Sequence, residues 1–354
     1  MENLNKAIAP PKLHLYNAIP EHLADIPVEK LDSILPGPSL IYIKGKVSPP
    51  IFISVLLHGN EITGFLAIQH LIKELSLTSR PAPRGIILFI GNIAAAKKGM
   101  RRLENEPDYN RIWNGGLLPE HYLAGAVLEK LSAKPLYAAI DIHNNTGKNP
   151  HYACINRTDP SFIHLARRFS KTIVYFTEPH EVISMALSHL CPSVTLECGF
   201  SGDVRGLNHV CNYLIQSLTM PAGNLFSPPS NKQSEIYHTI AKITVPDNAH
   251  LGFGNCKQDV DMCFRNDLEA LNFTTVPTGT KLGVTRAKEC TLHIADNDNR
   301  DVTGNYIMTE NNALITRKPL VPSMFTQNKT IIHQDCLGYI MEPYPMDQQK
   351  GQQR

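Results

Sequence analysis

The chain has 354 residues, of which 42% are apolar and 19% are charged, as in ordinary globular proteins and unlike disordered chains. A chain of this length accommodates about two domains. The formal charge of +2 comes without a basic run suited to a phosphate backbone, so we expect no nucleic-acid partner.

Strands and helices are expected to alternate along the first part of the chain. Apolar runs bounded by polar turns predict strands, and apolar residues at helical spacing predict helices. In chain order, strands are expected at 51–57, 85–90, 136–143, 172–176 and 193–197, and helices at 62–75, 123–131, 161–170 and 206–218. This alternation predicts an α/β fold with a mixed, largely parallel central sheet flanked by helices.

The composition changes at residues 220–233, where Pro, Gly, Asn and Ser disfavour regular structure. We therefore expect a larger α/β domain at 1–222, a smaller β-rich C-terminal domain at 223–345 and a disordered tail at 346–354. Short strands are expected in the second domain at 240–245, 272–276, 291–294, 306–309 and 313–316.

The eight cysteines are scattered and form no CxxC pair. The N-terminus has no apolar segment typical of export, and no stretch approaches the roughly 18 apolar residues of a membrane span. We expect a cytoplasmic protein without a membrane partner, whose cysteines are reduced and mostly buried.

Two histidines stand at the ends of apolar, strand-like runs. His58 follows the run 51–57, and Glu61 lies on the turn into the next helix, while Asp141 and His143 share one face of a later strand. Zinc accepts imidazole and carboxylate ligands, and three protein ligands with a fourth position left to water are typical of catalytic zinc. His58, Glu61 and His143 are therefore the candidate metal ligands. Asp141 is either a neighbour of His143 or a polar strand end.

A polar loop between two predicted elements carries Arg101, Arg102, Asp108, Asn110 and Arg111. Guanidinium groups and an amide in a loop suit recognition of a carboxylate and stabilisation of an oxyanion. The alternative is a solvated loop.

Glu197 occupies a strand position in otherwise apolar surroundings, just before a Cys-Gly pair. A buried carboxylate is costly unless it has a partner or a function. Glu197 is a candidate general base toward a metal-activated water. The alternative is an ordinary carboxylate at a strand end, facing water.

In chain order, the motifs HGNE, DYNR, DIHNNTG and LECG resemble those of the zinc carboxypeptidase superfamily, most closely its succinylglutamate desuccinylase/aspartoacylase branch. They span Leu57 to Gly199, somewhat under half of the chain. The resemblance implies one Zn²⁺ per chain on His58, Glu61 and His143. It also implies that Glu197 is the general base and later the proton donor.

The same resemblance implies that Asn110 and Arg111 hold a carboxylate of the substrate and that an upstream arginine polarises the scissile carbonyl. Arg102 matches that arginine best, although Arg101 is adjacent and the segment 103–109 looks a residue longer than in the aspartoacylase branch. The tyrosine that the family takes from a later segment finds no matching motif and is left unassigned.

The expected function is a zinc-dependent hydrolase that cleaves the amide bond of an N-acyl amino acid. One alternative is a metallocarboxypeptidase or peptide amidase that acts on short peptides by the same chemistry. Another is a binding protein without turnover, which would not need Glu197. The acyl group, the preferred amino acid and the oligomeric state are not fixed by the sequence.

Overall fold

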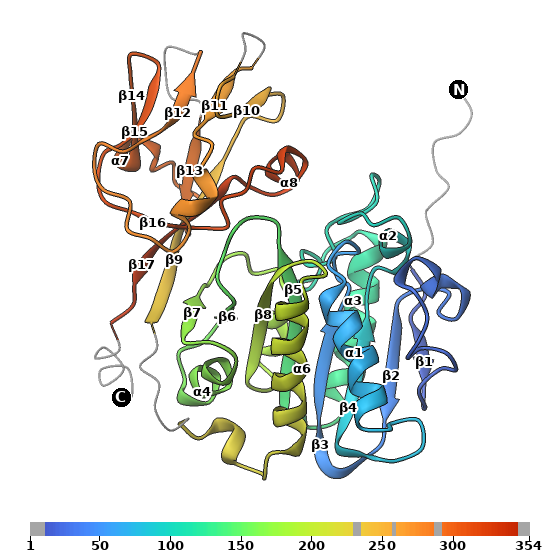
Figure 1. The fold of residues 1–354 in the computed structure, drawn as a ribbon. Coiled ribbons are helices and arrows are strands. Elements are labelled where there is room, and N and C mark those ends of the chain that lie inside the picture. The colour runs from blue at the N-terminus through green and yellow to red at the C-terminus, as the bar shows by residue number, and fades with distance from the viewer. Residues whose placement is uncertain (1–10, 229–234, 257–259, 287–291, 346–354) are drawn as a thin grey trace, which may run out of the picture. The chain divides into compact units, whose positions relative to one another are not determined.

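The computed structural model describes residues 11–228, 235–256, 260–286 and 292–345. As far as they are described, the residues form two compact units, shown with their elements in Figure 1. The first comprises Met1–Asn144, Tyr152–Ile173 and Pro179–Gln233, and the second Asn145–His151, Val174–Glu178 and Ser234–Arg354. The expected tail at 346–354 lies outside the described residues, and the domain boundary at 222/223 stays a prediction.

A mixed sheet forms the centre of the first unit, with strand order β1-β2-β4-β3-β5-β8-β6. Its strands are β1 (His14–Tyr16), β2 (Ser39–Ile43), β3 (Gly45–Val55), β4 (Ala82–Ile90), β5 (Ala138–Asn145), β6 (Tyr152–Ile155) and β8 (Ser193–Phe200), and β7 (Thr172–Tyr175) begins in this unit. β3 runs parallel to both β4 and β5, whereas β2 is antiparallel to β4 and β6 to β8. The predicted mixed, largely parallel sheet is confirmed.

Helices cover both faces of this sheet (Figure 1). They are α1 (Thr63–Glu74), α2 (Ile93–Lys97), α3 (Pro119–Ser132), α4 (Pro160–Phe169), α5 (Ile183–Leu187) and α6 (Val204–Thr219), with 3-10 turns η1 (Val28–Ser33) and η2 (Asn224–Phe226). Phe89 of β4 shares a core with Val127 of α3. On the opposite face α1 lies so close that a side chain at Gly64 would touch Val55 and Ile142 at 3.0 Å. α1 and α6 pack side by side. None of the described helices combines the length and apolarity needed to cross a membrane.

The second unit is rich in β structure, as expected. β9 (Glu235–Thr244) pairs antiparallel with β13 (His293–Asp296) and β17 (Gly338–Pro343), and β17 pairs with β16 (Val321–Ser323). A separate sheet has the order β10-β11-β12-β15-β14. Its strands are β10 (Leu251–Phe253), β11 (Met262–Phe264), β12 (Lys281–Thr285), β14 (Ile307–Glu310) and β15 (Ala313–Thr316), and the unit also contains η3 (Leu268–Leu271), α7 (Thr303–Tyr306) and α8 (Lys329–Gln334).

The strand predicted at 272–276 is wrong, because this segment turns. Phe273 adopts a positive φ of 57°, which is incompatible with a strand. The Asn272 side chain accepts a hydrogen bond from the Phe325 N–H at 2.8 Å and donates to the Phe325 oxygen at 2.9 Å. The Asn272 side chain thus makes the pair of backbone hydrogen bonds that a neighbouring strand would make. The turn is held in place without β-sheet pairing at this residue.

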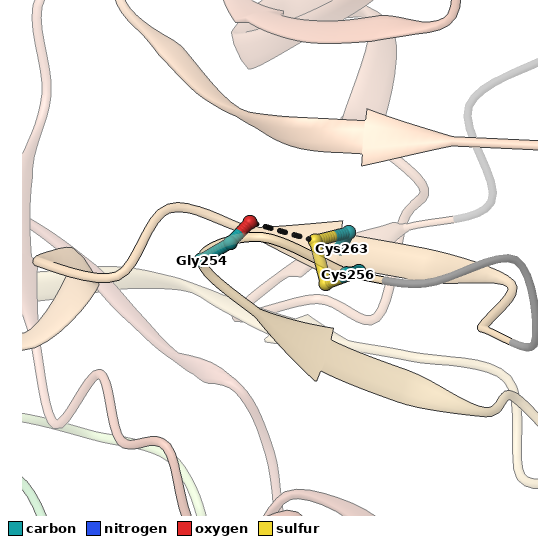
Figure 2. The surroundings of a disulfide bond; sticks show 3 residues. All are labelled: Gly254, Cys256 and Cys263. Atoms are coloured by element: carbon teal, nitrogen blue, oxygen red, sulfur yellow. Dashed lines mark hydrogen bonds between the residues drawn. A yellow bond between two sulfur atoms is a disulfide. The ribbon is translucent and has the colours of Figure 1, made fainter.

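The expectation that the cysteines are all reduced is also wrong. Cys256 and Cys263 form a disulfide, shown in Figure 2, and the Sγ of Cys263 lies 3.2 Å from the Gly254 carbonyl oxygen. Both cysteines are partly exposed. Five others are free and buried, as expected: Cys154, Cys191, Cys198, Cys211 and Cys336. Cys290 lies outside the described residues.

Candidate metal and catalytic site

The candidate site lies at strand ends of the first unit. β3 ends at Val55, and the chain then reverses at Leu56, whose positive φ of 55° is a strained conformation for a leucine. This reversal places His58 on a tight turn that the Glu61 N–H closes by donating to the His58 oxygen at 3.2 Å. His143 stands near the end of β5, which runs parallel to β3. Parallel strands end at the same edge of a sheet, so the two histidines meet there.

The three predicted metal ligands converge. Nδ1 of His58 lies 2.8 Å from one carboxylate oxygen of Glu61, and Nδ1 of His143 lies 2.8 Å from the other. One ligand atom from each residue can be chosen so that all lie within 4.8 Å of one another, and all three residues are buried. Two imidazole nitrogens and a carboxylate are a donor set for a divalent metal ion of borderline softness. These residues could therefore hold a metal ion.

The outer nitrogens of the two histidines face carboxylates. Nε2 of His58 lies 2.8 Å from Asp108, and Nε2 of His143 lies 2.8 Å from Asp141. A carboxylate behind a metal-binding histidine fixes the ring and leaves its inner nitrogen free for the metal. Asp141 is thus a neighbour of His143. The sequence assigned no such role to Asp108, for which the only signal was its place in the DYNR motif.

Charges inside the cluster stabilise one another. Burial favours the neutral form of Glu61, but His58 and His143 outweigh it and hold the pKa of this carboxyl well below its usual range. Burial likewise disfavours the charged form of His143, yet Asp141 and Glu61 raise its pKa well above the ordinary value. The pKa of Asp108 is lowered against its burial, chiefly by His58. These shifts favour the ionised forms of Glu61, Asp108 and His143, although all three side chains are largely shielded from solvent.

Glu197 of β8 is buried, with 8% of its surface exposed, so it does not face open water. Burial raises the pKa of Glu197 to about 8, and the nearby carboxylates of Glu61 and Asp141 raise it further against the lowering effect of His143 and Arg101. A carboxyl in this range can accept and release a proton near neutral pH.

Of the two adjacent arginines, the structure places Arg101 against the ligand cluster. Nε and one terminal nitrogen of Arg101 donate to the same oxygen of Asp108 at 3.1 and 2.9 Å, and its other terminal nitrogen lies 3.6 Å from Glu61. Arg102 instead donates to the Glu106 backbone oxygen at 2.7 Å. The Glu106 carboxylate in turn accepts the N–H of the residue after Arg102, so this longer segment closes into a turn of its own.

Asn110 and Arg111 lie next to the same cluster. Nδ2 of Asn110 is 3.4 Å from Nε2 of His143, and the amide oxygen of Asn110 accepts the Ile183 N–H at 3.1 Å. Arg111 donates to the Asn110 backbone oxygen at 2.9 Å and contributes to the lowered pKa of Asp108. The structure thus brings Asp108 and Asn110 of the DYNR motif to the histidines, with Arg111 next to them in the chain.

Residues 48–209 match the family described as the succinylglutamate desuccinylase/aspartoacylase catalytic domain. The match includes every residue of the cluster described above. The matched segment is somewhat under half of the chain. The resemblance of the four motifs is thereby confirmed. No curated protein matches the chain.

Solved structures show the same fold. The chain superposes on a succinylglutamate desuccinylase/aspartoacylase from Rhodobacter sphaeroides with a TM-score of 0.56, at 14% identity over 86% of this chain and 88% of the other. A succinylglutamate desuccinylase from Vibrio cholerae gives a TM-score of 0.54, at 15% identity over 85% and 84%. Murine aminoacylase 3 gives a TM-score of 0.53, at 14% identity over 84% and 97%.

Proposed function

We propose that the protein is a zinc-dependent amidohydrolase that removes the acyl group from an N-acyl amino acid. The observation that carries this proposal is the convergence of two histidine nitrogens and the Glu61 carboxylate in one buried cluster with Glu197, whose pKa of about 8 suits proton transfer. The match of this segment to the desuccinylase/aspartoacylase family supports the choice of substrate class.

His58, Glu61 and His143 would hold one zinc ion per chain. Their donor set fits zinc, and a site with three protein ligands is typical of catalytic rather than structural zinc. Zinc bound there would supply a Lewis acid for the scissile carbonyl and would lower the pKa of acids close to it, water included.

Glu197 would act as the general base and then as the acid. Its carboxylate takes a proton from the attacking water, and the resulting carboxylic acid returns the proton to the leaving amine. A group whose pKa lies near the working pH performs both transfers, whereas an ordinary carboxylate with a pKa near 4.5 would be a poor acid. Burial of Glu197 thus has a chemical consequence.

Arg101, rather than the predicted Arg102, would stabilise the oxyanion that develops on the carbonyl. Asp108 holds the guanidinium of Arg101 beside Glu61, and only 9% of the side chain is exposed. The guanidinium would therefore already be oriented toward the ligand cluster before substrate binds. One well-placed donor in such a site is worth roughly 3–4 kcal/mol. Asn110 and Arg111 would hold the substrate carboxylate, for which a guanidinium fork is well suited.

The test incubates zinc-loaded protein with N-acetyl-aspartate, N-succinyl-glutamate and a set of short peptides. Turnover is measured as the release of free amine. We expect turnover of at least one acyl amino acid and none of the peptides. Turnover of peptides alone would replace this proposal by the carboxypeptidase or peptide amidase alternative. Zinc content of the wild type is measured in parallel, and its absence would contradict the metal assignment.

Glu197→Gln is the matched variant for this assay. It keeps the shape of the side chain but cannot accept the proton, so we expect zinc to be retained and turnover to fall by roughly 10²–10⁴-fold. Glu120→Gln, in a buried position of α3, serves as the control and is expected to keep activity. Full activity in Glu197→Gln would contradict the assignment of the base.

A further inference from the structure

His143 has two neighbours that compete for its outer nitrogen. Nε2 lies 2.8 Å from a carboxylate oxygen of Asp141 and 3.4 Å from the amide nitrogen of Asn110. The carboxylate is an acceptor, so it favours a hydrogen on Nε2. When a metal ion takes the place of the proton that Nδ1 shares with Glu61, Nδ1 can then offer its lone pair. The amide nitrogen is a donor, so it favours the opposite tautomer, with the hydrogen on Nδ1. Only the first tautomer can bind a metal through Nδ1.

Asn110 cannot resolve this competition by turning its amide over. Its oxygen accepts the backbone N–H of Ile183 at 3.1 Å, which keeps the NH₂ group directed at His143. A reversed amide would set two donors against each other at Ile183. Which ring nitrogen of His143 carries the hydrogen therefore depends on whether the Asp141 carboxylate stays oriented toward Nε2.

Asp141 is oriented by Ser54. The Ser54 hydroxyl donates to the second carboxylate oxygen of Asp141 at 2.6 Å, which leaves the first oxygen directed at His143. The two residues are register partners on the adjacent parallel strands β3 and β5. Ser54 is 0% and Asp141 2% exposed, so bulk water does not replace this hydroxyl easily. A buried carboxylate needs such partners, and here the partner also fixes its rotation.

We propose that Ser54 is a positioning residue of the candidate metal site. Acting through Asp141, it holds the hydrogen of His143 on Nε2 and keeps Nδ1 available as a ligand. The inference rests on the proposed function in taking Nδ1 of His143 as a metal ligand, but it does not depend on the substrate. Without the hydroxyl, the carboxylate can rotate, and the Asn110 amide competes more effectively.

The test measures zinc affinity by competition with a chromophoric chelator at a fixed pH, together with the ¹H and ¹⁵N resonances of the His143 ring in zinc-loaded protein. Ser54→Ala removes the hydroxyl, Ser54→Cys keeps the volume with a weaker donor, and Ser54→Thr restores a hydroxyl. The control is Ser193→Ala on β8, which removes an equally buried hydroxyl that donates to the Ser184 backbone oxygen at 2.9 Å.

We expect Ser54→Ala to bind zinc about tenfold more weakly, within the range typical of residues that orient a ligand. The Nε2–H proton of His143 should resonate far downfield in the wild type and move upfield in the Ala and Cys variants. Ser54→Thr should restore both properties, and Ser193→Ala should leave both unchanged. Cys fills nearly the same space as Ser. If the Ala variant does not fold, the zinc affinity and the Nε2–H resonance of the Cys variant therefore test the inference.

Two results would overturn the inference. One is wild-type zinc affinity in both the Ala and Cys variants, and the other is weaker affinity with an unchanged Nε2–H resonance, since a merely structural loss would give that combination. Failure of the wild type to bind zinc would instead contradict the proposed metal site. Zinc binding without turnover of any amide would contradict the proposed reaction and leave the role of Ser54 standing.

Discussion

The two units differ in what they bury. In the first, His58, Glu61, Asp141, His143 and Glu197 are charged or titratable side chains with less than a tenth of their surface exposed. In the described part of the second unit, the buried polar side chains are neutral amides and hydroxyls: Asn145, Thr239, Asn272, Thr285, Thr316, Ser323 and Thr326. The remainder of its interior is an apolar cluster.

The first unit buries titratable side chains of the kind found in functional sites, whereas the buried side chains of the second unit serve packing and hydrogen bonding. Buried charges cost free energy unless they are paired, so a protein stabilised only by its core has no use for them. In the first unit they gather around one point, with His143 between the carboxylates of Glu61 and Asp141, which is the arrangement expected of a functional site. The pair of Arg265 with Asp267 in the second unit is instead exposed to solvent, with 31% and 59% of the two side chains accessible.

The strongest test of this contrast compares two adjacent arginines of the first unit. Arg101→Ala should lower kcat/KM by roughly 10²–10³-fold, because it removes a donor beside the candidate metal ligands. Arg102→Ala should change kcat/KM less than about tenfold, because Arg102 bonds to its own loop at Glu106. Steady-state kinetics on the best acyl amino acid, with zinc content checked, measure both. The reverse order would return the oxyanion role to Arg102.

A smaller effect is expected in the pH dependence of stability. The pKa of Glu197 rises from its ordinary value of 4.5 to about 8 on folding, so the folded protein holds this proton more tightly than the unfolded chain. The resulting stability is complete below about pH 4.5 and is lost as the pH rises to about 8. Metal-free Glu197→Gln should therefore gain stability relative to the wild type between pH 5 and 8.5, on the order of a few kcal/mol.

Urea unfolding of both metal-free proteins at the two pH values gives this difference. Glu120→Gln is again measured alongside as the buried Glu-to-Gln comparison. A constant difference between wild type and Glu197→Gln across the range would mean that Glu197 ionises in the folded protein as easily as in the unfolded chain.

The smallest effect is expected in the second unit. Arg265 pairs with Asp267 through two nitrogens at 2.5 and 2.7 Å, but the pair lies in solvent, where water and salt screen it. Arg265→Ala should cost less than about 1 kcal/mol in urea unfolding and leave kcat/KM and zinc affinity unchanged. A loss of activity in this variant would show that the second unit takes part in the chemistry.

Long, periodic elements of the first unit could be predicted from the sequence. The helix expected at 206–218 is α6, Val204–Thr219, and the strand expected at 136–143 is β5, Ala138–Asn145. The short strands β10, β11 and β12 were missed, because three to five residues carry little periodicity and depend on pairing with distant neighbours. The same reason explains Asn272, whose turn is fixed by Phe325.

Residues of the candidate site could be predicted where they come directly at the end of a strand. His58 and His143 end apolar runs, so their placement followed from the pattern of the chain. Contacts between distant segments did not: Asp108 meets His58 across 50 residues, and Ser54 meets Asp141 across 87. The contacts that distinguish Arg101 from Arg102 depend on a turn closed by Glu106, which no local pattern indicated.

The Cys256–Cys263 disulfide affects how the protein must be prepared. A thiol reductant that opens this bond also offers thiolates, which are strong ligands for zinc, so one reagent would act on both units at once. A phosphine reductant opens the disulfide without adding a thiolate of its own, so Cys256 and Cys263 are the only thiols that opening this bond releases. Purifying the protein in parallel with each reagent, and without either, separates loss of the cross-link from loss of the proposed metal before any variant is compared.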